Sequence, residues 1–337
     1  MELNHSKSLP WTFWHHQLHQ RLLNSPELLP QRKALLLAVS GGQDSMALLA
    51  LLRDLLPLHQ WTLKIWHGNH CWHSEACRIA TELGHWCDTQ SLVFRIDQAP
   101  KDLPRTEAAA RNWRYDSLAN LAEANGSDVV TGHTASDRAE NLLLQMSRGS
   151  DLAGLGSLRP VRLLKKSAPK FIQLRRPMLG FTRTATAAIC SDLNLPVWND
   201  PSNCSTALPR NKIRMEVLPI LEELYPGCSE RLAGLAERIS QVQDTQQILG
   251  TLALATLKRN NGLDRKALGD LPHPTRRQLL AQWLQTQNVP CLTAHTLEQL
   301  SLRLASGAAG GQADLPKGWK LSWQGLDLRL QPPLVKH

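Results

Sequence analysis

The segment Ala38-Val39-Ser40-Gly41-Gly42-Gln43-Asp44-Ser45 joins an apolar run, residues 34–39, to a stretch of helical periodicity, residues 45–56. The run has the length of a buried strand, and the Ser-Gly-Gly triplet interrupts it. Two glycines allow a tight turn that exposes backbone amides, and the following helix N-terminus adds positive potential. The segment therefore predicts a phosphate-binding loop between a strand and a helix. The expected phosphate-binding residues are Ser40, Gly41, Gly42, Gln43, Asp44 and Ser45.

Asp44 is an unusual residue to find in a phosphate-binding loop, because its carboxylate repels phosphate groups. It fits the loop if it holds a Mg²⁺ ion that bridges those phosphates. The sequence contains no GxxxxGK[ST] pattern, which excludes a Walker-type loop. The alternative for so short a string is a plain serine–glycine turn, and the strand–loop–helix context argues against it.

Further strand-like segments occur at residues 62–67, 92–96 and 128–131, and helical stretches separate them. Strands that alternate with helices predict βαβ crossovers. We therefore expect an α/β fold of Rossmann-like type, with a parallel sheet and helices on both faces. Ligands of such sheets bind at the carboxyl ends of the strands, which is where the glycine-rich loop lies.

The second half of the chain has a different character. Long helices are expected at residues 208–224 and 229–259, and Asn260-Asn261-Gly262 is a strong stop signal. Short alternating stretches near the C-terminus predict a small α+β module. We expect an N-terminal ATP-binding and catalytic domain over residues 1–225, followed by a helical linker and a C-terminal domain over residues 226–337.

Length and composition set broad limits on the class of protein. The 337 residues favour two domains, and 42% hydrophobic residues suffice for a buried core. No run of about 18 apolar residues and no N-terminal signal region occur, so we expect a cytoplasmic protein. The 7 cysteines include no CxxC pair, which argues against a disulfide framework and a zinc ribbon.

The net charge of +9 is a weak indication of a polyanionic partner. Part of the excess is local, since residues 152–191 contain eight basic residues and no acidic one. A solvated loop is the alternative for this segment. We favour contact with a polyanion, because the segment directly follows the predicted ligand site.

Further motifs accompany the loop in a specific order along the chain. They lie at residues 107–115, Thr131-Gly132-His133, residues 136–141, 148–155, 200–203 and 210–214. Together with the SGGxDS loop they resemble the tRNA(Ile)-lysidine synthetase family of the PP-loop ATP-pyrophosphatase superfamily. The resemblance covers residues 32–222 and continues more weakly through the second domain.

The resemblance implies a reaction between ATP, free L-lysine and tRNA(Ile) with a CAU anticodon. ATP adenylates the C2 carbonyl oxygen of the wobble cytidine and releases diphosphate. The ε-amine of lysine then attacks C2, and AMP leaves. The product, lysidine, pairs with adenine, so the tRNA changes from methionine to isoleucine identity and from AUG to AUA reading.

The catalytic residues that we expect are Asp44, Arg111, His133, Asp137 and Glu140. Asp137 and Glu140 are three residues apart and share one helical face. Two acids there suit the ammonium groups of lysine, and one could accept a proton from the attacking amine. The alternative is an acidic first turn stabilised by the helix dipole.

His133 ends a predicted strand, where it could contact the base or ATP, although a lone histidine is often structural. Arg111 could neutralise charge that develops on the α-phosphate. Its alternative is an ion pair with Glu107, one helical turn earlier.

The expected tRNA contacts are basic residues that position the phosphate backbone without reading its sequence. The wobble cytosine must leave the anticodon stack, and single-stranded loop bases are the targets for which this costs least. We expect the C-terminal module to supply selectivity. The oligomeric state stays open. The residues assigned to tRNA contact are Arg114, Arg175, Arg176, Arg210, Lys212 and Arg214.

The sequence departs from the family pattern at two places. Ser136 stands where the family commonly has a first acid before Asp137, which leaves any role of that acid in doubt. The segment 67–87 is rich in histidine and cysteine but lacks the tight ligand pairs of a zinc site, so we disfavour zinc.

Three other functions compete with lysidine formation. A thiolating member of the superfamily usually needs paired cysteines, and an amidating member needs a source of ammonia. A non-catalytic RNA-binding protein with a relic nucleotide fold predicts a degraded loop, yet Asp44, Asp137 and Glu140 are all present.

Overall fold

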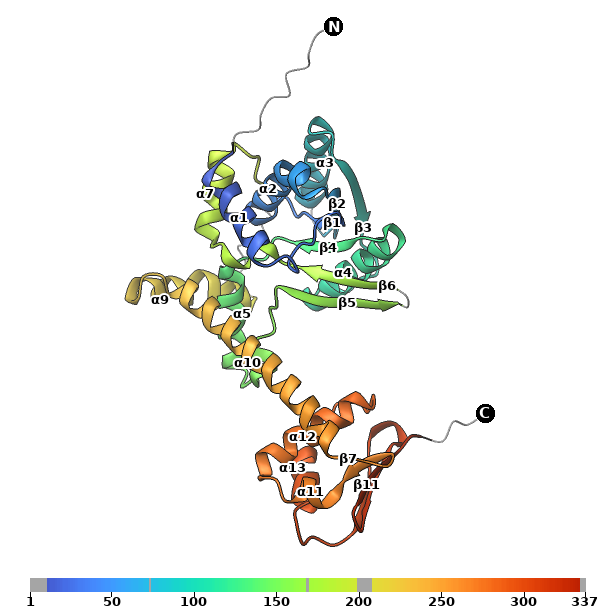
Figure 1. Ribbon diagram of the computed structural model, residues 1–337. Coiled ribbons are helices and arrows are strands. Elements are labelled where there is room, and N and C mark those ends of the chain that lie inside the picture. Colours follow the sequence, from blue (N-terminus) through green and yellow to red (C-terminus); the bar gives the residue numbers. More distant parts are fainter. Residues whose placement is uncertain (1–10, 73, 168–169, 199–207, 334–337) are drawn as a thin grey trace. The chain divides into compact units, whose positions relative to one another are not determined.

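The computed structural model of the protein describes residues 11–72, 74–167, 170–198 and 208–333. A six-stranded sheet forms the centre of its N-terminal part (Figure 1). The strands are β1 (Ala34–Ala38), β2 (Thr62–Asn69), β3 (Val93–Gln98), β4 (Asp128–Thr131), β5 (Val161–Ser167) and β6 (Lys170–Arg175). Their order is β3-β2-β1-β4-β6-β5, and all neighbours are parallel except β5 and β6. The expected α/β class is confirmed.

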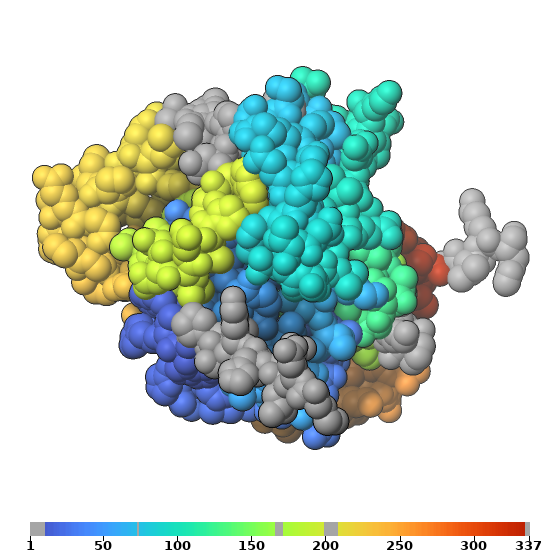
Figure 2. All heavy atoms as spheres, turned by 90° about the horizontal axis from the view of Figure 1, so that it is seen from above, coloured from blue at the N-terminus to red at the C-terminus, as the bar shows by residue number. Residues whose placement is uncertain are grey.

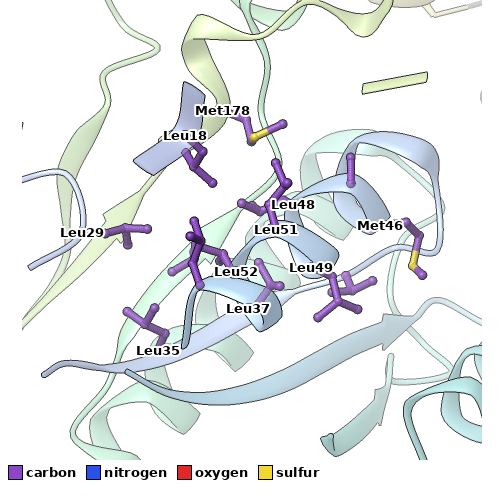
Figure 3. Packing of buried hydrophobic residues seen from close by; sticks show 14 of the residues in the cluster. Leu18, Leu29, Leu35, Leu37, Met46, Leu48, Leu49, Leu51, Leu52 and Met178 are labelled. Carbon is purple, nitrogen blue, oxygen red and sulfur yellow. The ribbon is translucent and has the colours of Figure 1, made fainter. Parts of the chain in front are cut away.

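Both faces of the sheet are covered by helices, as the sequence predicts. The helices of this part are α1 (Phe13–Asn24), α2 (Gln43–His59), α3 (Ser74–Thr89), α4 (Glu107–Asn125), α5 (Ala135–Ser147), α6 (Leu152–Leu155) and α7 (Arg183–Asp192). Leu35 and Leu37 of β1 pack into one core cluster with α1, α2, α3 and α7 (Figure 3). Leu36, between them, packs into a second cluster with Leu118 of α4. Each fully buried leucine contributes about 1.5–3 kcal/mol.

The order of the strands creates the ligand-binding edge. The chain moves from β1 to β2 and β3 on one side, then crosses back to place β4 on the other side of β1. Such a switch point leaves a crevice at the carboxyl ends of the two strands on either side of it. The glycine-rich loop follows β1, and α5 follows β4, so the N-termini of α2 and α5 both lie at this crevice.

The basic segment contains a hairpin that the sequence analysis did not predict. β5 and β6 pair antiparallel at the edge of the sheet, with a register shift between Leu163 and Lys165. Ile172 and Leu174 of β6 face the core and are 3% and 0% exposed, whereas Phe171 is exposed. This period-two burial explains why a segment of high charge forms strands.

Helices join the sheet to the C-terminal part. They are α8 (Pro209–Lys212), the π-helical turn η3 (Ile213–Val217), α9 (Leu218–Leu224) and the long α10 (Cys228–Thr256). By its contacts the chain divides into two compact units, Met1–Ser240 and Gln241–His337. The division falls within α10, so the expected domain boundary after residue 225 stays a prediction.

The second unit is a small α+β module, as expected. Its helices are α11 (Arg265–Gly269), α12 (His273–Thr286) and α13 (Ala294–Arg303), and its strands are β7 (Lys258–Arg259), β8 (Gly262–Asp264), β9 (Gly311–Asp314), β10 (Lys320–Gln324) and β11 (Asp327–Gln331). The antiparallel sheet has the order β7-β8-β11-β10-β9. Trp323 and Leu280 are buried in its core. The described residues also form 3₁₀ turns, η1 (Pro177–Gly180) in the first unit and η4 (Pro316–Gly318) in the second.

Among the helices of the described part, none is long and apolar enough to cross a bilayer.

Candidate active site

A cleft of about 290 Å³ lies at the switch point, where the carboxyl ends of β1 and β4 meet the N-termini of α2 and α5. Most of the residues predicted for ATP binding and catalysis line it, although they come from distant parts of the sequence. Predicted residues in the lining are Ser40, Gly42, Gln43, Asp44, Ser45, Arg111, Arg114, His133, Asp137, Arg210 and Arg214. Glu107, Tyr115 and Arg183 also line the cleft.

Hydrogen bonds within the glycine-rich loop stabilise its conformation. Gly42 caps the N-terminus of α2, and the Ser45 hydroxyl donates to its carbonyl at 2.8 Å. Gly41 has φ +86°, a left-handed conformation that favours glycine. A Cβ at Gly132, after β4, would lie 2.9 Å from the Asp44 carbonyl oxygen, so this glycine permits close approach of the chain after β4 to the first turn of α2. The loop has the shape expected of an anion-binding turn.

Asp44 is oriented from α7. Its carboxylate accepts a hydrogen bond from the buried Thr186 hydroxyl and lies 3.6 Å from the Arg183 guanidinium. Burial raises the pKa of Asp44, and Arg183 opposes that rise. Gln43 reinforces the junction, because its side-chain amide donates to the Arg183 carbonyl at 2.8 Å. Sequence analysis missed Thr186 and the role of Arg183, since about 140 residues separate them from the loop.

The donor set at this point fits a magnesium ion. Mg²⁺ takes oxygen ligands and usually keeps only one or two protein carboxylates beside the phosphates of a nucleotide. Asp44 provides such a carboxylate at the mouth of the loop, and the Thr186 hydroxyl keeps it oriented. The assignment of Asp44 to Mg²⁺ remains a prediction.

Asp137 and Glu140 lie on one face of α5, and two arginines bind them. Arg210 donates to Asp137 at 2.9 Å and to Glu140 at 2.9 Å. Arg214 donates to both Glu140 oxygens at 2.6 and 2.9 Å. Glu140 is 0% exposed and does not line the cleft, whereas Asp137 does. The two acids therefore occupy different positions relative to a substrate.

Asp137 also has the alternative role considered for it, that of an acidic residue in the first turn of a helix. Its carboxylate accepts from the backbone N–H and the hydroxyl of Thr134, at 2.7 and 2.9 Å, which forms a capping box at the start of α5. Burial pushes the pKa of Asp137 upward. The nearby Arg210 and Arg214 and the hydrogen bond from Thr134 outweigh burial, so the pKa is lowered. Asp137 is thus held as an anion facing the cleft.

Ser136, the departure from the family pattern, has a structural role. Its hydroxyl accepts a hydrogen bond from the backbone N–H of Arg183 at 3.1 Å. This bond ties the first turn of α5 to the first turn of α7. A serine at this position therefore joins the helix that carries Asp137 to the helix that orients Asp44.

His133 lies in the cleft next to the capping box. Its Nδ1 is 2.9 Å from the Thr131 hydroxyl. Burial lowers the pKa of His133 to about 3, and Arg176 and Arg210 add to the effect while Asp137 opposes it. The imidazole is therefore neutral at physiological pH, and it can act as a hydrogen-bond partner rather than as a cation.

Arg111 and Arg114 project from α4 into the cleft. The Arg111 guanidinium lies 5.6 Å from the centre of the Tyr115 ring, and Arg162 lies 5.1 Å from the same ring. Such distances permit cation–π attraction. Arg111 and Arg114 make this wall of the cleft suitable for phosphate groups. The expected contact of Arg111 with the α-phosphate stays a prediction.

The expected RNA contacts at Arg175 and Arg176 are not supported. Arg175 forms a buried ion pair with Asp128 at 2.8 Å and donates to the carbonyl oxygen of Leu28. Arg176 is 1% exposed and donates to the Arg159 carbonyl at 2.6 Å. Both side chains stabilise the interior, because β6 is a strand of the sheet rather than a solvated loop.

The remaining predictions have different outcomes. Lys212 is exposed beside the cleft residues of α8 and lies 3.9 Å from Glu216. Arg210 and Arg214, predicted as contacts to the RNA backbone, instead bind the acids of α5. The motif at residues 200–203 lies outside the described residues.

Comparisons with known proteins agree with these features. Residues 14–221 match the family model described as a PP-loop domain, and residues 263–329 match that of the TilS substrate binding domain. The U34-tRNA thiolase NcsA from Methanococcus maripaludis aligns with a TM-score of 0.56 at 16% identity, over 68% of this chain and 79% of that chain. This likeness shows the fold alone.

Curated relatives extend over nearly the whole chain. The tRNA(Ile)-lysidine synthase of Parasynechococcus marenigrum is 60% identical over 330 residues, covering 98% of each chain. A tRNA(Ile)-lysidine synthase of Prochlorococcus marinus is 42% identical over 322 residues, covering 93% of this chain and 95% of the relative. With both family models matched in order, the chain belongs to the tRNA(Ile)-lysidine synthase family.

Proposed function

We propose that the protein is an ATP-dependent ligase that attaches L-lysine to the wobble cytidine of tRNA(Ile) with a CAU anticodon. The observation that carries this function is the cleft in which the glycine-rich loop faces the Asp137 carboxylate. Membership of the lysidine synthase family favours it over thiolation and over a non-catalytic RNA-binding role.

The loop and its supports form the proposed ATP site. Backbone amides of the loop and the N-terminus of α2 offer donors and positive potential to the phosphates. Arg183 lies at the edge of this site and is free to turn from Asp44 toward the diphosphate when Asp44 takes a metal ion. When bound, Mg²⁺ would neutralise phosphate charge and orient the α-phosphate for attack.

Arg111 and His133 act on the activation step in this proposal. Arg111 stabilises the negative charge that develops on the α-phosphate as the C2 oxygen of cytosine attacks. A neutral His133 offers a hydrogen bond to the base without adding charge. The cleft thus directs its cations to the phosphate and its neutral donors to the nucleobase.

Asp137 is the acid that contacts the lysine amine in this proposal. It lines the cleft, and its lowered pKa keeps it ionised, so it can accept a hydrogen bond or a proton from the amine that attacks C2. Glu140 is fully buried and is bound by both arginines. It therefore positions Arg210 and Arg214, which in turn hold Asp137 in place. We propose that Glu140 acts on the reaction only through them.

The proposed RNA path uses exposed cations near the cleft together with the C-terminal unit. Arg114 lines the cleft from an exposed position on α4, and Lys212 is exposed on α8. Contacts of this type set the register of the RNA without reading its sequence. The module over residues 263–329 is the proposed source of selectivity for tRNA(Ile).

The reaction can be tested with purified components. The protein is incubated with ATP, Mg²⁺, labelled lysine and a tRNA(Ile) transcript bearing CAU, and an initiator methionine tRNA serves as the matched RNA control. We expect label in the isoleucine tRNA alone, with one AMP and one diphosphate for each lysine attached. Equal labelling of the methionine tRNA, or no lysine transfer, contradicts the proposal.

A further inference from the structure

Cys71 and Cys77 form a pair of thiols at the carboxyl end of β2, outside the cleft. Both cysteines are exposed, and the Cys71 thiol donates a hydrogen bond to the Asn69 backbone carbonyl at 3.9 Å. The buried Asn69 organises them, because its amide donates to the Cys77 sulfur at 3.5 Å and its side-chain oxygen accepts from the Cys71 backbone at 2.8 Å. Both cysteines are thus held at the same asparagine and are open to solvent.

Two other members of the segment rich in histidine and cysteine, His67 and Cys87, are buried. The His67 ring bonds to the Val39 carbonyl at 2.8 Å, and burial raises the pKa of Cys87 to about 12. Within the described residues, which omit His73, no group of three or more histidine, cysteine or acidic side chains could hold a metal ion. Cys71 and Cys77 are the exposed thiols of this segment. Burial and the neighbouring Cys77 raise the pKa of Cys71, so its thiolate forms more readily as the pH rises.

We propose that Cys71 and Cys77 are a site of reversible disulfide formation that weakens ATP binding. One thiolate attacks glutathione disulfide and releases a glutathione thiolate, which takes up a proton. The second thiolate then attacks the mixed disulfide, the internal S–S bond forms, and a second glutathione leaves. The two cysteines lose two electrons and two protons, and one glutathione disulfide becomes two glutathione molecules.

Helix α3 connects this bond to the phosphate-binding loop. Ile79 follows Cys77 by two residues, and a Cβ at Gly41 would lie 3.1 Å from its Cγ2 atom. Trp198 contacts the loop as well, because its backbone N–H donates to the Gly41 carbonyl at 3.0 Å. The Trp198 indole donates in turn to Glu82 of α3 at 2.6 Å. In Figure 2 the yellow-green part of the surface borders the light-blue to cyan part, which agrees with this hydrogen bond.

A disulfide changes this arrangement because it fixes the two sulfurs about 2.05 Å apart. The first turn of α3 then moves toward the end of β2, and Ile79 moves with it. Gly41 has a left-handed backbone and close neighbours on two sides, so it has little room to adapt. The loop amides that would bind phosphate therefore lose their alignment.

The test uses the reduced full-length protein in mixtures of oxidised and reduced glutathione. Free thiols are trapped by alkylation, the linkage is located by mass spectrometry, and ATP binding is measured by direct titration without tRNA or lysine. We expect a Cys71–Cys77 bond and a several-fold rise in Kd for ATP, reversed by dithiothreitol. Cys71→Ser and Cys77→Ser should bind ATP normally and stay insensitive to oxidation.

Cys291→Ser is the matched control, because Cys291 is also exposed but lies in the other compact unit. This variant should respond to oxidation as the parent protein does. Glutathione attached to single cysteines without an internal bond, or an internal bond that leaves the Kd for ATP unchanged, would overturn the proposal. Loss of ATP binding already in the reduced protein would instead count against the proposed nucleotide site.

Discussion

At the scale of single residues, the main finding is that the two acids of α5 have unequal positions. Asp137 faces the cleft, while Glu140 is enclosed by Arg210 and Arg214. Two acids that are three residues apart on one helical face suggest equivalent partners for the two ammonium groups of lysine. Their burial separates them into Asp137, which faces the cleft, and Glu140, which holds the arginines.

The variant Asp137→Asn should lose lysine transfer far more than ATP binding. The amide keeps the size of the side chain but removes the charge that meets the amine, so transfer should fall by about 10²-fold or more. Single-turnover lysine transfer and ATP titration measure the two effects. Equal loss of both would contradict the assignment. Glu140→Gln is the comparison: it leaves two buried guanidinium groups underpaired and should cost about 3–5 kcal/mol of stability.

Arg183→Gln should raise the KM for ATP and the inhibition constant of diphosphate, each by about tenfold. The reason is that Arg183 lies at the edge of the loop, 3.6 Å from Asp44, and carries charge suited to the departing diphosphate. Steady-state kinetics with diphosphate as product inhibitor measure both constants. Arg95→Gln, an exposed arginine on β3, should leave them unchanged. A weaker AMP inhibition with unaltered diphosphate inhibition would refute this role.

His133 should contribute to the loss of stability in acid. Its pKa in the folded protein is about 3, below the ordinary value of 6.5, so the unfolded chain binds more protons between these values. Stability therefore falls as pH decreases from about 6.5 toward 3, because protonation favours the unfolded state. Urea unfolding midpoints should show a shallower decline over this window for His133→Gln than for the parent. Parallel curves for the two proteins would rule the effect out.

At the scale of elements, the N-termini of α2, α5 and α7 converge on the cleft. Thr134 starts α5 and binds Asp137, Ser136 bonds to the first residue of α7, and Thr186 of α7 bonds to Asp44. These are short polar contacts among buried groups, so each helix start fixes the next. The carboxylates of Asp44 and Asp137 are thereby held on helices rather than on loops.

Thr134→Ala should destabilise the protein by about 1 kcal/mol, since it removes the N-cap of α5. It should also slow lysine transfer, because Asp137 loses the hydroxyl that orients its carboxylate. Chemical denaturation and the transfer assay measure the two effects. Thr134→Ser keeps the hydroxyl and should restore both, whereas failure of serine to rescue transfer would mean that the threonine methyl group matters instead.

At the scale of the whole molecule, the net charge of +9 favours a polyanionic partner, and we expect exposed cations such as Lys212 to meet it. Binding to tRNA should weaken steeply with salt, because each phosphate contact releases counterions. Lys212→Gln should lower the slope of log K against log salt by about 1. Filter binding over a range of salt concentrations measures this slope, and an unchanged slope would remove Lys212 from the RNA path.

Arg175→Gln is the matched comparison for that experiment. It should leave the salt slope unchanged but destabilise the fold by about 3–5 kcal/mol, because the buried Asp128 loses its close partner and keeps only the Lys33 ammonium group at 3.8 Å. A reduced slope with normal stability would restore Arg175 as an RNA contact. The pair of variants therefore separates charge that meets RNA from charge that holds the sheet together.

The sequence by itself determined the α/β class, the phosphate-binding loop, the family resemblance and the acids of α5. These follow from local signals: an apolar run, a Ser-Gly-Gly break and motifs within a few residues of each other. The tertiary structure alone decided that Arg210 and Arg214 bind those acids, that Thr186 and Arg183 support Asp44, and that Arg175 is buried. The positions of charged residues along the sequence do not show which partner each side chain contacts. That depends on contacts between residues some 47 to 142 positions apart.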